Sequence, residues 1–239
     1  MSIVLITGSD SNQMEIINPD NSTTKCQNDY TYPISVLAAS GAVVDGTIVV
    51  CGGTSPTTKQ CYSFGNDKEW KPISPMTTPR RFAASIPINN ALWVACGYDD
   101  EYNDLKSTEL VYLYGRRTKP QLPEVRYGSC AAEYNGNIFL IGGNDGSARN
   151  NNWIINTNDD FKVTDGPNML KTRYYHSCGI FHSHAHSGRA VIVTAGFRWV
   201  DDSPEFICEF WDFTVQGTTW QLCSKSWSKI TLIALHAKL

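Results

Sequence analysis

Short apolar runs alternate with polar turns along this chain, and one combination of them recurs. Residues 43–53 hold an apolar run, the turn Asp45-Gly46, a second apolar run and a pair of glycines. Residues 88–97 and 133–143 repeat the pattern, about 45 residues later each time, with the turns Asn90-Ala91 and Asn135-Gly136 in the same register. A period in this range indicates a repeat architecture.

The recurring segment predicts a β-hairpin. Asp-Gly and Asn-Gly tolerate the positive φ angles of a type I′ turn, whose twist matches the two strands that it joins. Glycine at the end of the second strand lets the backbone bend or approach a neighbour where a Cβ atom would clash. The spacing makes Gly52, Gly97 and Gly142 equivalent. The glycines expected at these strand ends are Gly52, Gly53, Gly97, Gly142, Gly143 and Gly196.

Two shorter strands are expected after each hairpin, at 61–64 and 70–73 in the first complete period. Four-stranded units of this length are the blades of a β-propeller. An arginine precedes the first strand of three repeats, and the sixteen-residue spacing from Arg126 to Gly142 selects Arg81 over Arg80 for this position. We expect an all-β, single domain over residues 1–239, with repeats at 1–32, 33–79, 80–123, 124–171 and 172–227.

Three motifs carry a family resemblance: Cys51-Gly52-Gly53 followed by Cys61-Tyr62 and Trp70, Asn-x-Leu-x-Ser-x-Glu at 103–109, and Gly166-Pro167 ahead of Arg173. They resemble kelch repeats, in the divergent kelch-like form found in invertebrate proteins, over roughly residues 2–224. The resemblance implies a kelch-type β-propeller of about five four-stranded blades. Trp70 and Trp220 are expected in outer strands.

The two ends of the chain suggest how such a ring would close. Residues 2–6 read as a second strand with no first strand before them, and an apolar run lies at 230–237. Residues 228–239 are therefore a candidate closing strand that pairs with the N-terminal strand and covers its edge. The competing interpretation is a truncated propeller with more blades.

Strand polarity predicts where a ligand would bind. The first strand of each hairpin starts after an arginine and the second ends at a glycine, so both points lie at one end of the blade. The kelch resemblance implies a non-catalytic module that binds a protein or peptide there, with the arginines contacting acidic peptides. In the competing interpretation, the arginines bond neighbouring backbone carbonyls. The predicted ligand-face residues are Arg81, Arg126, Arg173, Thr54, Asp99, Asn144 and Arg198.

The eight cysteines are informative about whether the protein is secreted or cytoplasmic. Cys51 and Cys61 lie across one hairpin connection and are expected to form a disulfide if the protein is secreted, and Cys208 and Cys223 bracket the last hairpin similarly. Cys130 and Cys178 are expected to be small buried thiols. With the sequon at 21–23, these features favour an extracellular over a cytoplasmic location, although the chain shows no signal peptide.

The sequence gives only weak signals of nucleic-acid binding, membrane insertion, metal binding or catalysis. A net charge of −3 gives no basic field for nucleic acid, and no apolar segment is long enough to span a membrane. His182, His184 and His186 alternate as zinc or copper ligands would, and residues 99–104 carry calcium-type oxygens, but a hairpin tip and a polar loop explain both. We expect no metal, cofactor or catalytic residue. A galactose-oxidase-like or other propeller enzyme, and a fragment without independent function, are the alternatives.

Overall fold

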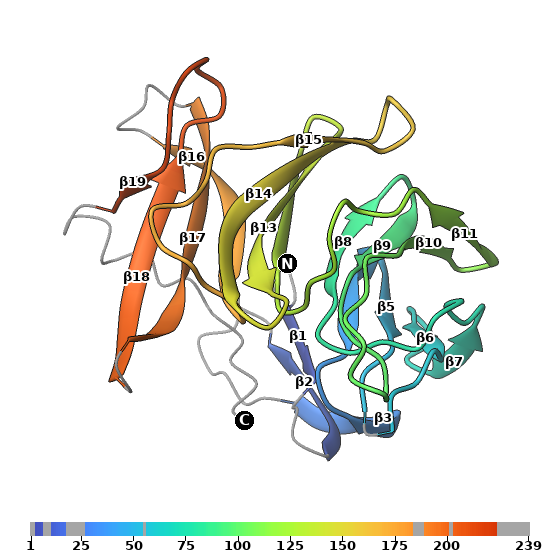
Figure 1. Ribbon diagram of the computed structural model, residues 1–239. Helices are drawn as coiled ribbons and strands as arrows, with labels where there is room; N and C mark the ends of the chain where they lie inside the picture. The colour runs from blue at the N-terminus through green and yellow to red at the C-terminus, as the bar shows by residue number, and fades with distance from the viewer. Residues whose placement is uncertain are drawn as a thin grey trace.

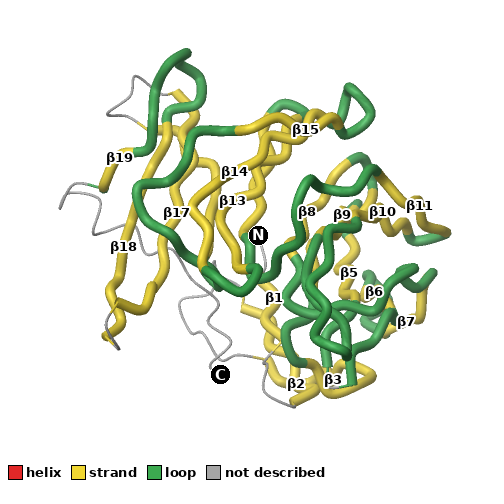
Figure 2. The backbone as a smooth tube through the Cα atoms, in the orientation of Figure 1, coloured by secondary structure: helices red, strands yellow, loops and turns green. Residues whose placement is uncertain are grey.

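The protein is built from antiparallel β-sheets. The computed structural model describes residues 3–6, 11–17, 27–54, 56–183, 189–200 and 203–223, and within these ranges the chain forms strands and loops but no helix (Figure 2). The described strands form four four-stranded sheets and one three-stranded sheet, each with its strands in chain order. Within the described residues, no helix is long and apolar enough to cross a bilayer.

We call the three-stranded unit the N-terminal sheet and number the others as blades. The N-terminal sheet holds β1 (Ile3–Ile6), β2 (Ser11–Ile17) and β3 (Gln27–Val36). The first blade holds β4 (Ser40–Val44), β5 (Thr47–Cys51), β6 (Cys61–Phe64) and β7 (Trp70–Ile73). The second blade holds β8 (Ala84–Ile88), β9 (Ala91–Ala95), β10 (Thr108–Tyr112) and β11 (Gly115–Lys119).

The third and fourth blades follow the same plan. The third blade holds β12 (Cys130–Tyr134), β13 (Asn137–Asn144), β14 (Ala148–Asn156) and β15 (Lys162–Asp165). The fourth blade holds β16 (Ser177–Ser183), β17 (Arg189–Val200), β18 (Ser203–Trp211) and β19 (Gln221–Leu222). The predicted short outer strands at 61–64 and 70–73 are thus confirmed as β6 and β7.

The blades radiate from their innermost strands. β4 contacts β8, β8 contacts β12 and β12 contacts β16, so the first strand of each blade lies beside the first strand of the next. Figure 1 shows the sheets succeeding one another, from β4–β7 and β8–β11 on the right, through β13–β15, to β16–β19 on the left. This is the arrangement of a β-propeller, and four complete blades lie in the described part of the chain.

The core lies between neighbouring blades, as this arrangement requires. Val44, Cys51 and Met76 of the first blade pack with Leu92 and Val94 of the second. The second and third blades share a cluster around Trp93 and Trp153, and the third and fourth share one around Phe139 and Trp220. The N-terminal sheet packs on the first blade, where Tyr32 meets the ring of Trp70 edge-on at 4.7 Å. Trp70 lies in the outer strand β7, as predicted, whereas Trp220 lies just before β19 and not in it; both side chains serve the contacts between sheets.

The hairpin turns have the predicted geometry, with one shift in position. Asp45 and Gly46 have φ angles of 51° and 74°, and Asn135 and Gly136 have 50° and 75°, as a type I′ turn requires. In the second blade the two positive φ angles belong to Asn89 and Asn90, because Ile88 pairs with Ala91. The predicted turn Asn90-Ala91 is therefore wrong by one residue.

The predicted register of the glycines is wrong by the same residue. The N–H groups of Gly53, Gly97 and Gly143 each donate to the carbonyl of an arginine in the next repeat, Arg80, Arg126 and Arg173, all at 2.9 Å. Gly97 is thus equivalent to the second glycine of the other repeats. Cys96, with φ 65°, occupies the first position.

In the first and third blades, the first glycine of the pair leaves no room for a side chain. A Cβ atom on Gly52 would lie 2.4 Å from the Arg80 carbonyl oxygen and 2.9 Å from the Met76 side chain. A Cβ atom on Gly142 would meet the equivalent groups, the Arg173 carbonyl at 2.7 Å and Met169 at 3.0 Å. The segment that leads into the next blade therefore passes too close for a Cβ atom at Gly52 and Gly142.

In the described part of the chain, three disulfides join six cysteines. Cys51–Cys61 pairs β5 with β6, which confirms the predicted disulfide, and Cys208–Cys223 links β18 to the segment after β19. Cys130–Cys178 connects the innermost strands of the third and fourth blades. The expectation that Cys130 and Cys178 are free thiols is wrong, because it ignored that β12 and β16 lie side by side. Among the described residues, only Cys96 is free, and it is buried.

The structure contradicts one prediction about the N-terminal region and does not reach the predicted closing strand at the C-terminus. β3 spans 27–36, so the repeat boundary placed between 32 and 33 falls inside a strand. The N-terminal sheet has the order β1-β2-β3, and β1 pairs with β2 at Ile3–Ile17. The candidate closing strand at 228–239, the sequon at 21–23, His184 and His186 lie outside the described residues.

Candidate ligand-binding face

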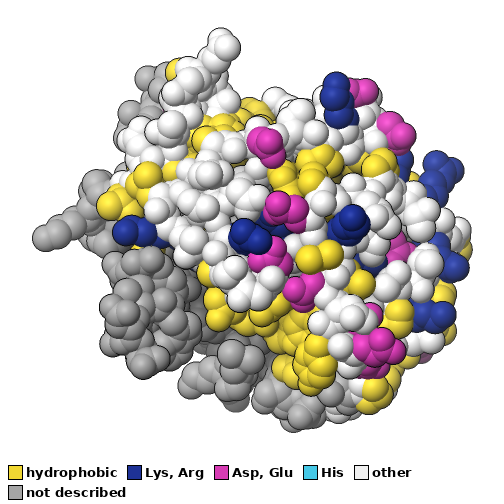
Figure 3. Space-filling view, viewed as in Figure 1, with side chains coloured by type: hydrophobic (Ala, Val, Ile, Leu, Met, Phe, Trp, Pro, Cys, Tyr) yellow, Lys and Arg dark blue, Asp and Glu magenta, His cyan; other side chains and the backbone are white. Residues whose placement is uncertain are grey.

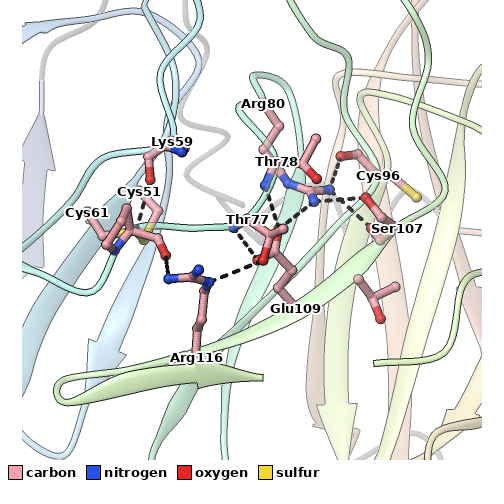
Figure 4. Close-up of polar contacts among 12 residues, drawn as sticks. Cys51, Lys59, Cys61, Thr77, Thr78, Arg80, Cys96, Ser107, Glu109 and Arg116 are labelled. Atoms are coloured by element: carbon pink, nitrogen blue, oxygen red, sulfur yellow. Dashed lines mark hydrogen bonds and ion pairs between the residues drawn. A yellow bond between two sulfur atoms is a disulfide. The ribbon is translucent and has the colours of Figure 1, made fainter. Parts of the chain in front are cut away.

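A buried arginine, Arg80, fixes the segment that enters the second blade, which we call the lead-in (Figure 4). The Arg80 guanidinium donates through Nη1 to the carbonyls of Cys96 at 2.8 Å and Ser107 at 3.0 Å, and through Nη2 to the Glu109 carboxylate at 2.8 Å. The side chains of Arg80 and Glu109 are 0% and 1% exposed. The same carboxylate accepts the backbone N–H groups of Thr77 at 2.6 Å and Thr78 at 3.2 Å, so both charges are compensated inside the protein.

The fourth blade repeats the arginine-glutamate part of this network. Arg173 forms a buried ion pair with Glu209 and donates to the Ile207 carbonyl at 3.1 Å. Glu209 accepts the N–H groups of Leu170 at 2.7 Å and Lys171 at 3.1 Å, which precede Arg173 as Thr77 and Thr78 precede Arg80. The arginine-glutamate pair is therefore a repeated device that fixes the segment entering a blade.

The third blade keeps the buried arginine but lacks the glutamate that pairs with it in the second and fourth blades. Arg126 donates to the Gly142 carbonyl at 2.9 Å and the Asn151 carbonyl at 3.3 Å, as Arg80 does to Cys96 and Ser107. Trp153 stands where Glu109 stands in the second blade, and the Arg126 guanidinium lies 3.5 Å from its ring centroid. A cation–π contact thus takes the place of the buried ion pair, and Arg126 keeps a longer ion pair, 3.4 Å, to the half-exposed Glu124.

These contacts correct the assignment of the arginine doublet. Arg80, not Arg81, is equivalent to Arg126 and Arg173, and the error follows from aligning Gly97 with Gly142 instead of Gly143. Arg126 and Arg173 are 0% and 1% exposed, and their donors point at backbone carbonyls. Their geometry is that of the competing interpretation, in which the arginines fix the blades. Burial lowers the pKa of Arg80, opposed by Glu109, while the hydrogen bonds and the Arg80 charge outweigh burial and lower the pKa of Glu109.

A chain of backbone hydrogen bonds runs from blade to blade just after these arginines. Phe82 N–H donates to the Ala38 carbonyl at 3.0 Å, Gly128 to Phe82 at 2.9 Å, and Tyr175 to Gly128 at 2.8 Å. All four residues have left-handed φ angles, between 52° and 62°. Because each bond crosses to the next blade, the residues beside it are gathered at one end of the four innermost strands.

Aromatic side chains fill that end, and we call them the aromatic patch. It consists of Phe82, Tyr98, Tyr102, Tyr127, Tyr174 and Tyr175, contributed by the second, third and fourth blades. Tyr98 stacks on Phe82 at 5.4 Å and meets Tyr127 edge-on at 5.2 Å between ring centroids. Tyr175 lies 4.7 Å from Phe82 and 5.9 Å from Tyr127. The six rings therefore form one continuous surface across three blades.

The patch is partly open to solvent. Tyr102 is 74% exposed, and the other five rings are half-buried. Burial raises the pKa of Tyr98, Tyr127 and Tyr175, so all three phenols are neutral at physiological pH. Within the described part of the chain, no hydroxyl of these tyrosines has a hydrogen-bond partner.

Arg81 is part of this surface. Its guanidinium lies 4.8 Å from the Tyr98 ring centroid and 5.4 Å from that of Tyr102, while Arg81 is only 7% exposed. It therefore supports the edge of the patch by cation–π contacts instead of presenting a free cation.

Acidic loops border the patch. Asp104 pairs with Tyr98 through the backbone, and its charge contributes to the raised pKa of both Tyr98 and Tyr127. Burial, helped by the charge of Asp145, raises the pKa of Asp104 itself. Asp145 is held by two donors of Arg149, and Asp100 accepts the Thr57 N–H, which links the loops of the first and second blades.

The other predicted face residues lie at this end of the blades, where strand polarity places them. Thr54 donates its N–H to the Leu37 carbonyl at 2.8 Å, and Asn144 exchanges two backbone bonds with Tyr127, both at 2.9 Å. The carboxylate of Asp99 accepts the N–H groups of Glu101 and Asn103, each at 2.9 Å, which closes its own loop. Arg198 lies in β17 opposite Glu205, and its side chain is outside the described residues.

Two histidines of the fourth blade, His176 and His182, lie in different surroundings. His176 is buried beside Arg173, and burial together with that positive charge lowers its pKa to about 3, so it is neutral. His182 is exposed. Among the residues that the structure describes, no cluster of three or more histidine, cysteine, aspartate or glutamate side chains is placed to hold a metal ion.

Comparison with known proteins identifies the architecture. No family model and no curated protein matches the sequence. Of 203 matching chains of solved structures, one is described as the structure of YjhT, a kelch-repeat β-propeller protein, with a TM-score of 0.72 and 10% identity over 87% of this chain and 77% of that chain. The fold is that of a kelch-type β-propeller. At this identity the likeness concerns the fold alone.

Proposed function

We propose that this kelch-type propeller is a non-catalytic binding module that takes a protein or peptide partner on the aromatic patch. The observation that carries the proposal is the continuous surface of six aromatic rings, drawn from three blades and left partly exposed at the end where the loops converge. Tyrosine is enriched among the residues that dominate binding energy, because it offers a large rigid contact area with a polar tip.

Two further features support binding in place of a purely structural role. The tyrosine hydroxyls of the patch have no partner within the described residues, so they are free to bond an incoming group. The opposite end of the blades carries tight two-residue turns at Asp45-Gly46 and Asn135-Gly136, which offer little surface. The side of the molecule in Figure 3 mixes hydrophobic, acidic and basic side chains, unlike the uniformly basic surface of a nucleic-acid-binding protein.

The proposal is tested by affinity capture from the native tissue. The double variant Tyr98→Ala, Tyr127→Ala is expected to weaken capture of the wild-type partner by about a hundredfold or more, since a central aromatic contact contributes about 2 kcal/mol or more. Tyr114→Ala is the matched control, because Tyr114 is 97% exposed in a turn of the second blade. Equal capture by a correctly folded double variant would exclude the patch as the binding surface.

We propose further that the ring has five blades, with the N-terminal sheet completed by the segment 228–239. Three strands in the order β1-β2-β3 are one short of a blade, and β3 already packs against the first blade. An added strand on β1 would complete the unit and cover its edge. Deleting residues 228–239 is expected to lower the melting temperature and the cooperativity of unfolding. A deletion variant that melts like the full chain would contradict this closure.

A further inference from the structure

We infer that the ligand segment recognised by the aromatic patch is basic, with an arginine or lysine side chain lying over the tyrosine rings beside Asp104. This inference rests on the proposed binding function and names the chemistry of its ligand. It is carried by the position and the unpaired state of Asp104, the engagement of the neighbouring cations, and the acidic loop that borders the patch.

Asp104 borders the patch and has no charged partner among the residues that the structure describes. Its backbone pairs with that of Tyr98, and its carboxylate acts electrostatically on the phenols of Tyr98 and Tyr127, which belong to neighbouring blades. The side chain is half-buried, yet among the described residues it has neither an ion pair nor a hydrogen bond. A half-buried carboxylate beside aromatic faces is suited to a cation supplied from outside.

The cations near the patch are already engaged by the protein. Arg81 is stacked over Tyr98 and Tyr102 and is 7% exposed. Arg149 holds Asp145 through two of its nitrogens, and Arg126 is fully buried against Trp153. An acidic ligand would therefore find no freely exposed guanidinium among these arginines. This differs from the acidic peptide that the family resemblance suggested.

The loop of residues 99–104 in the second blade adds negative charge, which would attract a basic ligand. Residues 99–104 carry four acidic side chains, Asp99, Asp100, Glu101 and Asp104, and none of them lies within 4.0 Å of a lysine or arginine nitrogen in the described chain. Acidic residues next to exposed tyrosine faces attract an arginine or lysine electrostatically, and the rings then hold the cation by their π faces. The surface thus complements a basic, extended peptide.

The experiment selects peptide ligands from random sequences. A phage library of random dodecapeptides is panned on the full-length wild-type protein, and the selected sequences are expected to be enriched in arginine and lysine. A fluorescein-labelled peptide from this set is then titrated by fluorescence polarisation. Asp104→Asn is expected to weaken its binding by about tenfold, as for loss of one partner of a close charge pair. Asp165→Asn, on the exposed outer strand β15, is expected to leave it unchanged.

The outcomes separate this inference from the proposed function. Selection of acidic peptides whose binding is lost in the Tyr98→Ala, Tyr127→Ala variant would overturn the basic ligand while supporting the patch as a binding surface. Basic peptides that bind this double variant as tightly as the wild type would overturn the inference by placing them elsewhere. Equal binding of the selected basic peptide to Asp104→Asn and wild type would overturn the role of Asp104. A library that yields no enriched peptide would also contradict it.

Discussion

Replacing Arg80 with alanine is expected to lower the free energy of unfolding by about 3 to 5 kcal/mol, whereas replacing its neighbour Arg81 should lower it by about 1 kcal/mol. The two residues are adjacent in sequence but differ in what they hold. Arg80 makes hydrogen bonds to Cys96, Ser107 and Glu109 in the interior. Arg81 rests on two tyrosine rings at the end of the blades.

The large effect of Arg80→Ala follows from the charge that it leaves behind. Glu109 would remain 1% exposed in the native packing with no cation to compensate it. Its other partners, the N–H groups of Thr77 and Thr78, belong to the lead-in that Arg80 fixes, so local order would be lost with the charge pair. For a chain of this length, the expected loss corresponds to a fall of about 10 °C in melting temperature.

Denaturant unfolding of the two single variants measures this difference directly. The additional variant Arg80→Ala, Glu109→Gln is expected to recover part of the loss, because it removes the uncompensated charge while keeping one amide oxygen that accepts the N–H group of either Thr77 or Thr78. Equal stability of Arg80→Ala and Arg81→Ala would contradict the assignment of Arg80 to the buried position.

Removal of the Cys130–Cys178 disulfide is expected to be the largest effect of any cysteine substitution. The disulfide closes a separation of 48 residues, for which loss of loop-closure entropy in the unfolded chain predicts about 4 kcal/mol. It also joins the innermost strands β12 and β16 of neighbouring blades. The Cys51–Cys61 disulfide closes only 10 residues within one blade, which predicts about 2.7 kcal/mol.

The comparison uses two double variants, Cys130→Ser with Cys178→Ser and Cys51→Ser with Cys61→Ser. Unfolding of both in denaturant, under oxidising conditions that keep the remaining disulfides intact, should show the larger loss for the first. A tryptic digest of the unreduced wild-type protein should contain the linked Cys130 and Cys178 peptides. Free thiols at both positions in protein prepared under the same oxidising conditions would rule out this pairing.

The hairpins and the repeat architecture could be predicted from sequence because their signals are local. Asp45-Gly46 and Asn135-Gly136 encode their turns in two residues, and β6 and β7 are short apolar segments ahead of polar loops. The register of the second blade could not, because Cys96 adopts a positive φ at a position where the first and third blades have Gly52 and Gly142. Because this position holds cysteine in place of glycine, the sequence alignment is shifted by one residue. The choice of Arg81 in place of Arg80 follows from that shift.

Strand polarity predicts the end of the blades that carries the site, but the sequence does not predict the aromatic patch, because its rings come together only across blades. Phe82, Tyr127, Tyr174 and Tyr175 lie within two residues after the repeated arginines, so aromatic residues at this point of each repeat are a signal available in the sequence. Its meaning depends on the blade-to-blade backbone bonds that place these rings in contact. The same holds for Cys130 and Cys178, which local spacing does not pair but neighbouring innermost strands bring together.

Hydrogen-exchange mass spectrometry of the wild-type protein with its captured partner tests the central claim most directly. The claim is that the partner binds the end of the blades that carries the aromatic patch. Protection is expected in peptides that cover 98–105, 126–128 and 173–176, with no change at the turns 45–46, 89–90 and 135–136. Protection confined to those turns, with the peptides around Tyr98, Tyr127 and Tyr175 exchanging as in the free protein, would contradict it.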